Sequence, residues 1–215
     1  MRTASKWISG IAVVSLAVFL CVTVGLPVVQ GSATPKAVAG PDTFTTIDFP
    51  GVSTTRSSGI NPRGDIVGQY TSAGVTHGFL LSGDTFTTID FPGASFTAAR
   101  DINPQGNIVG EYISAGVTHG FLLSGNAFTT IDFPGASSTI PFDISPQGDI
   151  IGQYISAGVT HGFLLSGDTF TTIDFPGASF TILSGGNPQG DIVGRYISAR
   201  CDPRLSVERQ HFHHD

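Results

Sequence analysis

The sequence predicts an all-β protein, a β-propeller-like array of four-stranded antiparallel meander blades, on three observations. Three phrases of sequence recur in a fixed order with a period of 42 residues, which is the size of one propeller blade. Within the phrases, apolar and polar residues alternate over runs too short for helices. The chain contains 28 glycines and 13 prolines, and these residues separate the runs as turns.

The first phrase predicts a strand that a proline ends. From Thr85 to Phe91, β-branched and aromatic residues alternate between two faces, as they do in a strand. Pro92 and Gly93 end this run, and a second, weaker strand is expected from Ser95 to Ile102. The four copies of the phrase, Phe-Thr-Thr-Ile-Asp-Phe-Pro-Gly, occupy residues 44–51, 86–93, 128–135 and 170–177.

The second phrase predicts a tight turn and a return strand. In the copy Asn-Pro-Gln-Gly-Asn-Ile-Val-Gly-Glu-Tyr at residues 103–112, proline takes the second position and glycine the fourth, as a type I turn prefers. The strand from Asn107 to Ile113 then forms the second arm of a hairpin. The turn-defining residues of the four copies are Pro62, Pro104, Pro146 and Pro188 with Gly64, Gly106, Gly148 and Gly190.

The third phrase, Thr-His-Gly-Phe-Leu-Leu-Ser-Gly at residues 118–125, predicts the last strand of the unit, from Thr118 to Leu123. It recurs from Thr76 and from Thr160 but does not appear a fourth time. A β-solenoid is the alternative repeat fold, and it fits less well because its strands do not return on themselves through hairpins. Each blade is expected to pack its apolar residues against the next blade, since one blade alone has too little core.

The chain is expected to divide into a leader, an array and a tail. Residues 1–39 read as a signal peptide, with basic residues, an apolar run at 11–29 and candidate cleavage sites after Ala33 and Ala39. An uncleaved membrane anchor formed by residues 11–29 is the alternative, because the run is long enough to span a bilayer. The repeat units are 42–83, 84–125, 126–167 and the incomplete 168–199, and the non-repeat tail is 200–215.

The tail is interpreted as the missing third phrase read in a shifted frame. Codons chosen for a sixteen-residue run that contains that phrase and continues into the next unit, Gly-Val-Thr-His-Gly-Phe-Leu-Leu-Ser-Gly-Asn-Thr-Phe-Thr-Thr-Ile, with one nucleotide added in front, translate into all sixteen residues of 200–215. If the repeat continues with aspartate, the shifted frame then reaches a stop codon. The sequence therefore favours an insertion after Ala199, genuine or a sequencing error, that truncates a longer array.

No metal or cofactor site is predicted. Residues 101–106 partly resemble the start of a calcium loop, but the proline turn explains the same residues. The tail holds a thiol and imidazoles, which are transition-metal ligands, but the shifted frame accounts for all of them. These tail residues are Cys201, His211, His213 and His214.

Residues that recur in the units are interpreted as structural. One histidine per unit is expected to hydrogen-bond to a neighbouring turn, and one strand-end aspartate is expected to accept backbone hydrogen bonds. A catalytic centre needs different groups in different roles around one point, and near-identical repeats offer none, so the protein is not expected to be an enzyme. The recurring residues are His77, His119 and His161 and Asp48, Asp90, Asp132 and Asp174.

Charge and cysteine content exclude several classes of partner. Residues 41–199 carry 13 acidic side chains against four arginines and no lysine. Such a surface repels phosphate backbones, so no nucleic-acid partner is expected, and contact with a membrane is expected only through an uncleaved N-terminal segment. Cys21 and Cys201 both lie outside the repeats, so disulfides do not hold the array together.

The phrases at residues 86–93, 102–110 and 118–123 resemble the extracellular repeat proteins of the HAF family, found in bacteria. That family is named for a His-Ala-Phe signature, and this chain has His-Gly-Phe at each of the three corresponding places, the second being 119–121. The likeness covers residues 42–199 and implies an exported, propeller-like repeat protein. It carries over no catalytic residues.

The sequence thus predicts a secreted, extracellular repeat protein with a binding or structural role, acting through loops on one face of the array. Its ligand is not identified beyond the classes of carbohydrate and protein. The alternative is an extracellular propeller enzyme that acts on a polysaccharide or another cell-wall polymer.

Overall fold

The structure, a computed structural model, describes residues 44–198 and the backbone of 210–211. The chain divides into two units, Met1–Phe44 and Thr45–Asp215, and the array lies in the second. Every regular element within the described residues is a β-strand. The prediction of an all-β array of four-stranded antiparallel blades is therefore confirmed.

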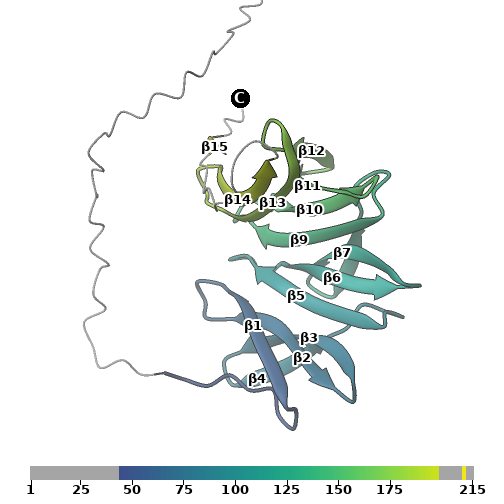
Figure 1. The fold of residues 1–215 in the computed structure, drawn as a ribbon. Coiled ribbons are helices and arrows are strands. Elements are labelled where there is room, and N and C mark those ends of the chain that lie inside the picture. Colours follow the sequence, from purple (N-terminus) through teal and green to yellow (C-terminus); the bar gives the residue numbers. More distant parts are fainter. Residues whose placement is uncertain (1–43, 199–209, 212–215) are drawn as a thin grey trace, which may run out of the picture. The chain divides into compact units, whose positions relative to one another are not determined.

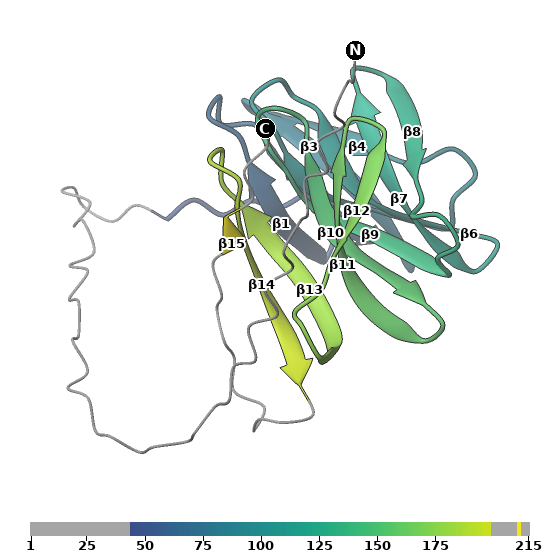
Figure 2. The same ribbon diagram turned by 90° about the horizontal axis from the view of Figure 1, so that it is seen from above.

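The strands form successive meanders, and within each blade every strand after the first pairs with the one before it (Figures 1 and 2). The fourth blade is incomplete, and its first strand touches the third blade through one parallel bridge, Thr160 to Phe180. The first blade contains β1 (Thr54–Ile60), β2 (Ile66–Ser72), β3 (Val75–Ser82) and β4 (Thr85–Ile89). The second contains β5 (Phe96–Ile102), β6 (Ile108–Ser114), β7 (Val117–Ser124) and β8 (Ala127–Ile131). The third contains β9 (Ser138–Ile144), β10 (Ile150–Ser156), β11 (Val159–Ser166) and β12 (Thr169–Ile173). The fourth contains β13 (Ala178–Gly186) and β14 (Asp191–Ser198), with β15 (Gln210–His211) paired to β14.

Each sheet combines three strands of one sequence unit with the first strand of the next unit. The strand at Thr85–Ile89 pairs with β3, and it does not pair with the strand that follows it. The reason lies in the two connections. A tight turn at Gly83, where φ is +58°, folds β4 back onto β3, whereas the Pro92–Gly93 segment carries the chain into the next blade.

Each Asn-Pro-x-Gly segment closes the hairpin between the first two strands of its blade. In the second blade, the Gly106 amide donates to the Asn103 carbonyl at 3.0 Å, and Gly106 has a φ of +90°, which favours glycine. The Asn103 side-chain oxygen accepts from the amides of Gln105 and Asn107, at 3.1 and 2.9 Å. The side chain thereby fixes the turn that the proline preorganises.

The hydrophobic cores lie between blades rather than within them. Val67 of β2 packs in one cluster with Ile102 of β5 and Phe121 of β7. One period later, Val109 packs with Ile144 of the next blade in the same way. Because each core takes residues from two blades, removal of a neighbour exposes apolar surface on the blade that remains.

The glycine of each His-Gly-Phe triplet lies where two blades approach closely. A Cβ atom on Gly120 would stand 2.7 Å from Pro141 Cδ of the next blade and 2.9 Å from the Ile131 carbonyl oxygen. At Gly162 it would stand 2.8 Å from Leu183 Cγ. These short distances leave no room for a side chain at this position.

Aromatic rings hold each connection between blades. The ring of Phe91, just after β4, stacks on Tyr112 of the next blade with centroids 3.6 Å apart and an interplanar angle of 3°. The Phe91 amide donates to the Thr97 hydroxyl at 3.1 Å. The same stack recurs at Phe133 with Tyr154, at 3.7 Å and 2°. The first phrase therefore serves two blades, one through its strand and the next through its second phenylalanine.

Several sequence predictions fall on parts of the chain outside this description. The signal peptide or anchor at residues 1–39 and the tail from 200 onward lie outside the described residues, apart from the backbone of β15. Within the described part of the chain, no helix is long and apolar enough to cross a membrane.

Replacing Gly120 with alanine tests the close approach. The new methyl group would displace Pro141 or the backbone of Ile131, so Gly120→Ala is expected to lower the free energy of unfolding by about 1–3 kcal/mol in urea titrations. Gly185→Ala is the matched control, because its Cβ would meet Val193 Cγ2 at an ordinary 3.6 Å. Equal losses in the two variants would contradict the role of the blade contact.

Candidate functional site

Two rows of polar side chains run along the array, at opposite ends of the second strand of each blade. One row consists of the Asn-Pro-x-Gly turns and the Ser-Pro-Gln-Gly turn of the third blade, which precede the second strands, and is called here the turn row. The other consists of histidine–aspartate pairs beside the turns that follow the second strands. The histidine–aspartate pairs join strands within a blade, whereas the turn row joins neighbouring blades. The candidate site lies in the turn row.

The histidines join the third and fourth strands of one blade. Nδ1 of His77 lies 2.9 Å from an Asp90 carboxylate oxygen, and its ring stacks on Tyr70 with centroids 5.1 Å apart. The sequence predicts backbone donors for this carboxylate, but its hydrogen-bond partner is the imidazole. The reason is that β4 pairs with β3 and ends next to His77. The other pairs are His119 with Asp132 at 2.9 Å and His161 with Asp174 at 2.6 Å, where Asp174 also accepts from the Gly162 amide at 3.3 Å.

Asp48 differs from its counterparts in the other units. Position 35, thirteen residues before it, is proline, whereas the other three units have histidine at the corresponding place. The remaining three pairs repeat one geometry, so they fasten each fourth strand to its blade and offer no set of different groups at one point.

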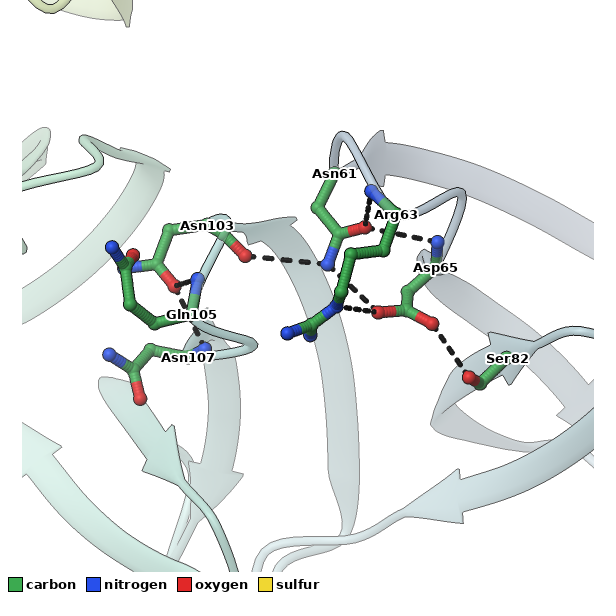
Figure 3. Close-up of polar contacts among 7 residues, drawn as sticks. All are labelled: Asn61, Arg63, Asp65, Ser82, Asn103, Gln105 and Asn107. Carbon is green, nitrogen blue, oxygen red and sulfur yellow. Dashed lines mark hydrogen bonds and ion pairs between the residues drawn. The ribbon is translucent and has the colours of Figure 1, made fainter.

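The turn row links neighbouring blades (Figure 3). The Asn61 amide nitrogen donates to Asp65 within its own turn at 2.9 Å and to the carbonyl of Asn103 in the next blade at 3.4 Å. Asn103 donates to the Ser145 carbonyl in the same way, at 3.4 Å. Ser145 keeps the turn bonds through its hydroxyl but has no amide to donate onward. The junction between the third and fourth turns therefore differs from the two before it.

Three side chains hold the Asp65 carboxylate beside the first turn (Figure 3). The Ser82 hydroxyl donates to it at 2.6 Å, Asn61 donates at 2.9 Å, and the Arg63 guanidinium lies at 3.0 Å. These bonds, that from Ser82 first, lower the pKa of Asp65 to about 2. The carboxylate is therefore charged and fully engaged in the structure of the first turn.

Two further carboxylates lie just before the turns and bridge blades at their first strands. Asp101 accepts from the Ile144 amide at 3.1 Å, and Asp143 accepts from the Gly186 amide at 2.5 Å. Burial, followed by a hydrogen bond to the Asp143 carboxyl, raises the pKa of Asp101 to about 7. The Asp101 carboxyl is thus held partly protonated at neutral pH.

The sequence predicts a turn at Asp101 and does not predict its pairing with Asp143. A signal for the pairing exists, since the corresponding positions of the outer units are Gly59 and Gly185. A Cβ on Gly59 would stand 2.6 Å from Asp101 Oδ1, so glycine makes room for the carboxyl.

One ion pair breaks the repeat symmetry. Arg100 bonds to Glu111, which is only 6% exposed, and the guanidinium lies 5.9 Å from the ring centroid of Phe142 in the next blade. In the neighbouring blades, the residues at the position of Glu111 are Gln69 and Gln153, which carry no charge. The sequence shows this difference in charge, but the interpretation of the units as near-identical did not predict the ion pair.

A pocket of about 330 Å³ opens between the third and fourth turns, where the amide link is missing. Its lining combines carboxylate, amide and hydroxyl groups with an apolar part formed by Ile151, Leu164 and Ile192. The polar lining residues are Asp143, Ser145, Gln147, Asp149, Asn187, Gln189 and Asp191. Across residues 44–198, no three or more His, Cys, Asp or Glu side chains gather as a metal site would require. The pocket is the candidate functional site.

Comparisons with known proteins give fold likeness only. No family model matches the chain, and no curated protein matches it. Among solved structures, it is similar to one titled a streptogramin B lyase, at 16% identity and a TM-score of 0.37, covering 73% of this chain and 54% of that one. It is also similar to a catalytically inactive virginiamycin B lyase from Staphylococcus aureus with quinupristin, at 13% identity and a TM-score of 0.40, covering 74% and 56%. The chain thus spans a little over half the length of these structures.

The comparison corrects one sequence prediction. The protein was not expected to be an enzyme, but both similar structures are lyases, which are enzymes. The expectation also neglected residues that differ between blades, such as Arg100 and Glu111. Likeness at this level transfers neither a substrate nor a catalytic residue to this chain.

The Asp101–Asp143 pair predicts a specific pH dependence. Because the folded-state pKa of Asp101, about 7, lies above its unfolded value of 3.8, the folded state binds the extra proton between these values. Stability is therefore expected to fall as pH rises from about 4 through 7. Asp101→Asn keeps an acceptor for the Ile144 amide and cannot ionise, so urea midpoints of this variant should show a flatter profile. Parallel profiles for the two proteins would contradict the assignment.

The amide link of the turn row is tested by two substitutions at Asn103. Asn103→Ser should keep the turn bonds, as Ser145 does, and lose only the link between blades, lowering the free energy of unfolding by about 0.5–1.5 kcal/mol. Asn103→Ala should lose both and be less stable than the serine variant. If the two variants have the same urea midpoint, the turn bonds contribute nothing.

Proposed function

We propose that this chain is an exported repeat protein that binds a neutral, hydroxyl-rich ligand of the carbohydrate class in the pocket between its third and fourth turns. The observation that carries the proposal is the mixed lining of that pocket, where side chains of Asp149, Gln147 and Gln189 accompany the apolar part. Binding sites for small ligands combine an apolar wall with a few placed polar groups in the same way.

The chemistry of the lining favours hydroxyl groups as partners. Amides both donate and accept hydrogen bonds, and carboxylates accept them, so the pocket can pair with several hydroxyls at once. The acidic surface disfavours phosphorylated or sulfated ligands. The volume of about 330 Å³ lies at the lower end of the range of about 300–1,000 Å³ that small-molecule sites occupy.

The turns hold the pocket in shape. Asn187 accepts from the amides of Gln189 and Asp191 at 3.0 and 2.9 Å, and its amide donates to Asp191 at 2.8 Å. Ser145 fixes the facing turn through Gln147 and its neighbours. A rigid backbone that displays polar side chains reduces the entropy lost on binding.

Binding is tested on a glycan array, followed by calorimetry with the glycans that bind. Gln147→Ala and Gln189→Ala should each weaken binding by about tenfold, the loss of roughly one hydrogen bond in a desolvated site. Gln105→Ala is the matched control, since it occupies the same turn position outside the pocket and should bind as the unmodified chain does. Equal affinities in all four proteins would place the ligand elsewhere, and no binding by any neutral glycan would reject the proposal.

Export is proposed on the leader pattern of residues 1–39 and on the resemblance to the HAF family. Expression of the full chain in a bacterium should release a product into the medium whose mass matches cleavage after Ala33 or Ala39. Recovery of the uncleaved chain in the membrane fraction would instead assign residues 11–29 as an anchor.

A further inference from the structure

The two ends of the array expose opposite halves of the contact that joins neighbouring blades. On the second strand of the first three blades, one apolar residue faces the next blade and is almost fully buried, with exposures of 0% for Val67, 0% for Val109 and 5% for Ile151. The corresponding residue of the fourth blade, Val193, is 39% exposed. Ile197 lies four residues further along β14, on the same face as Val193, and is 51% exposed.

The first blade lacks cover on its other face. On the first strand of the second and third blades, Ile102 and Ile144 are each only 4% exposed, because they pack on the preceding blade. The corresponding residue of the first blade, Ile60, is 65% exposed. Ser57 is exposed where its counterpart Ala99 is fully buried.

Inside the chain, these two kinds of residue meet each other. Val67 lies in one cluster with Ile102, and Val109 lies in one cluster with Ile144. Val193 and Ile60 are the two members of the same pair that have no partner blade in the described part of the chain. A second copy of this chain carries the missing half for each end.

We propose that copies of this protein associate head to tail, with the exposed face of β14 in one copy packed on the exposed face of β1 in the next. Val193 would contact Ile60 of the second copy as Val109 contacts Ile144 within the chain. Such a contact is heterologous, so it can repeat and build rings or open chains. The contact continues an interface that the protein already uses between its own blades.

Charge does not oppose this contact. Arg195 on β14 lies 5.7 Å from the ring centroid of Phe180 in its own blade. It takes the sequence position that Glu111 has in the second blade. There, the guanidinium of Arg100, which binds Glu111, lies over Phe142 of the next blade. Position 58, which corresponds to Phe142, is serine, so the arginine would face an uncharged residue. The fourth blade offers only two long strands, so the contact is smaller than an internal one and should depend on concentration.

The test is the molar mass of the full chain by light scattering over a wide range of concentrations. The unmodified protein should rise from the monomer mass to at least twice that mass. Ile60→Asp and Val193→Asp should each remain at the monomer mass, because each removes one half of the proposed contact. Both residues are exposed, so the substitutions leave the internal cores intact. Val117→Asp is the matched control, since Val117 is 41% exposed away from both faces, and it should associate like the unmodified chain.

Mixing the two interface variants tests the head-to-tail geometry. Ile60→Asp keeps an intact β14 face and Val193→Asp keeps an intact β1 face, so an equimolar mixture should form a dimer of twice the monomer mass and stop there. A mixture that stays monomeric would overturn the proposal, as would an unmodified chain that is monomeric at every concentration. In the latter case the faces would serve another partner, such as further blades of a longer array.

Discussion

The packing of an apolar residue from one blade against an isoleucine of the next is the contact on which the rest of this structure depends. Val67 and Val109 have no exposed surface, and each packs in a cluster with an isoleucine of the next blade, Ile102 and Ile144 respectively. The cores therefore form between units and not inside them, and stability is a property of neighbours. The close approach at Gly120 and Gly162 follows from the same contact.

At one end of the blades, polar side chains also join neighbouring blades through hydrogen bonds. Asn61 and Asn103 each reach the next turn through an amide, and Asp101 and Asp143 reach the backbone of the next blade through a carboxylate. The serine at position 145 ends the amide series, and the pocket lies at the junction that follows. The candidate site is thus a local exception within a repeated structural scheme. The histidine–aspartate pairs, which act within blades, show no such exception among the three complete blades.

Much of this fold follows from periodicity, and the parts that do not follow have physical reasons. Alternation and turn residues predict the strands, because both depend on local sequence. Periodicity does not determine which sheet a strand joins, since a repeat can be divided at any point, and Thr85–Ile89 belongs to the sheet before it. The Asp101–Asp143 pair and the Arg100–Glu111 pair depend on contacts across blades or strands and on small departures from the repeat. The sequence displays these departures but does not show which of them meet.

Hydrogen exchange of the intact chain, followed strand by strand in dilute solution, tests the dependence on neighbours most directly. The second and third blades have a neighbour on both sides, and the first and fourth have one among the described residues. The amides of β6 and β10 are therefore predicted to exchange more slowly than those of β2 and β14. Equal exchange rates in the four second strands would contradict the account, because each blade would then be stable without its neighbours.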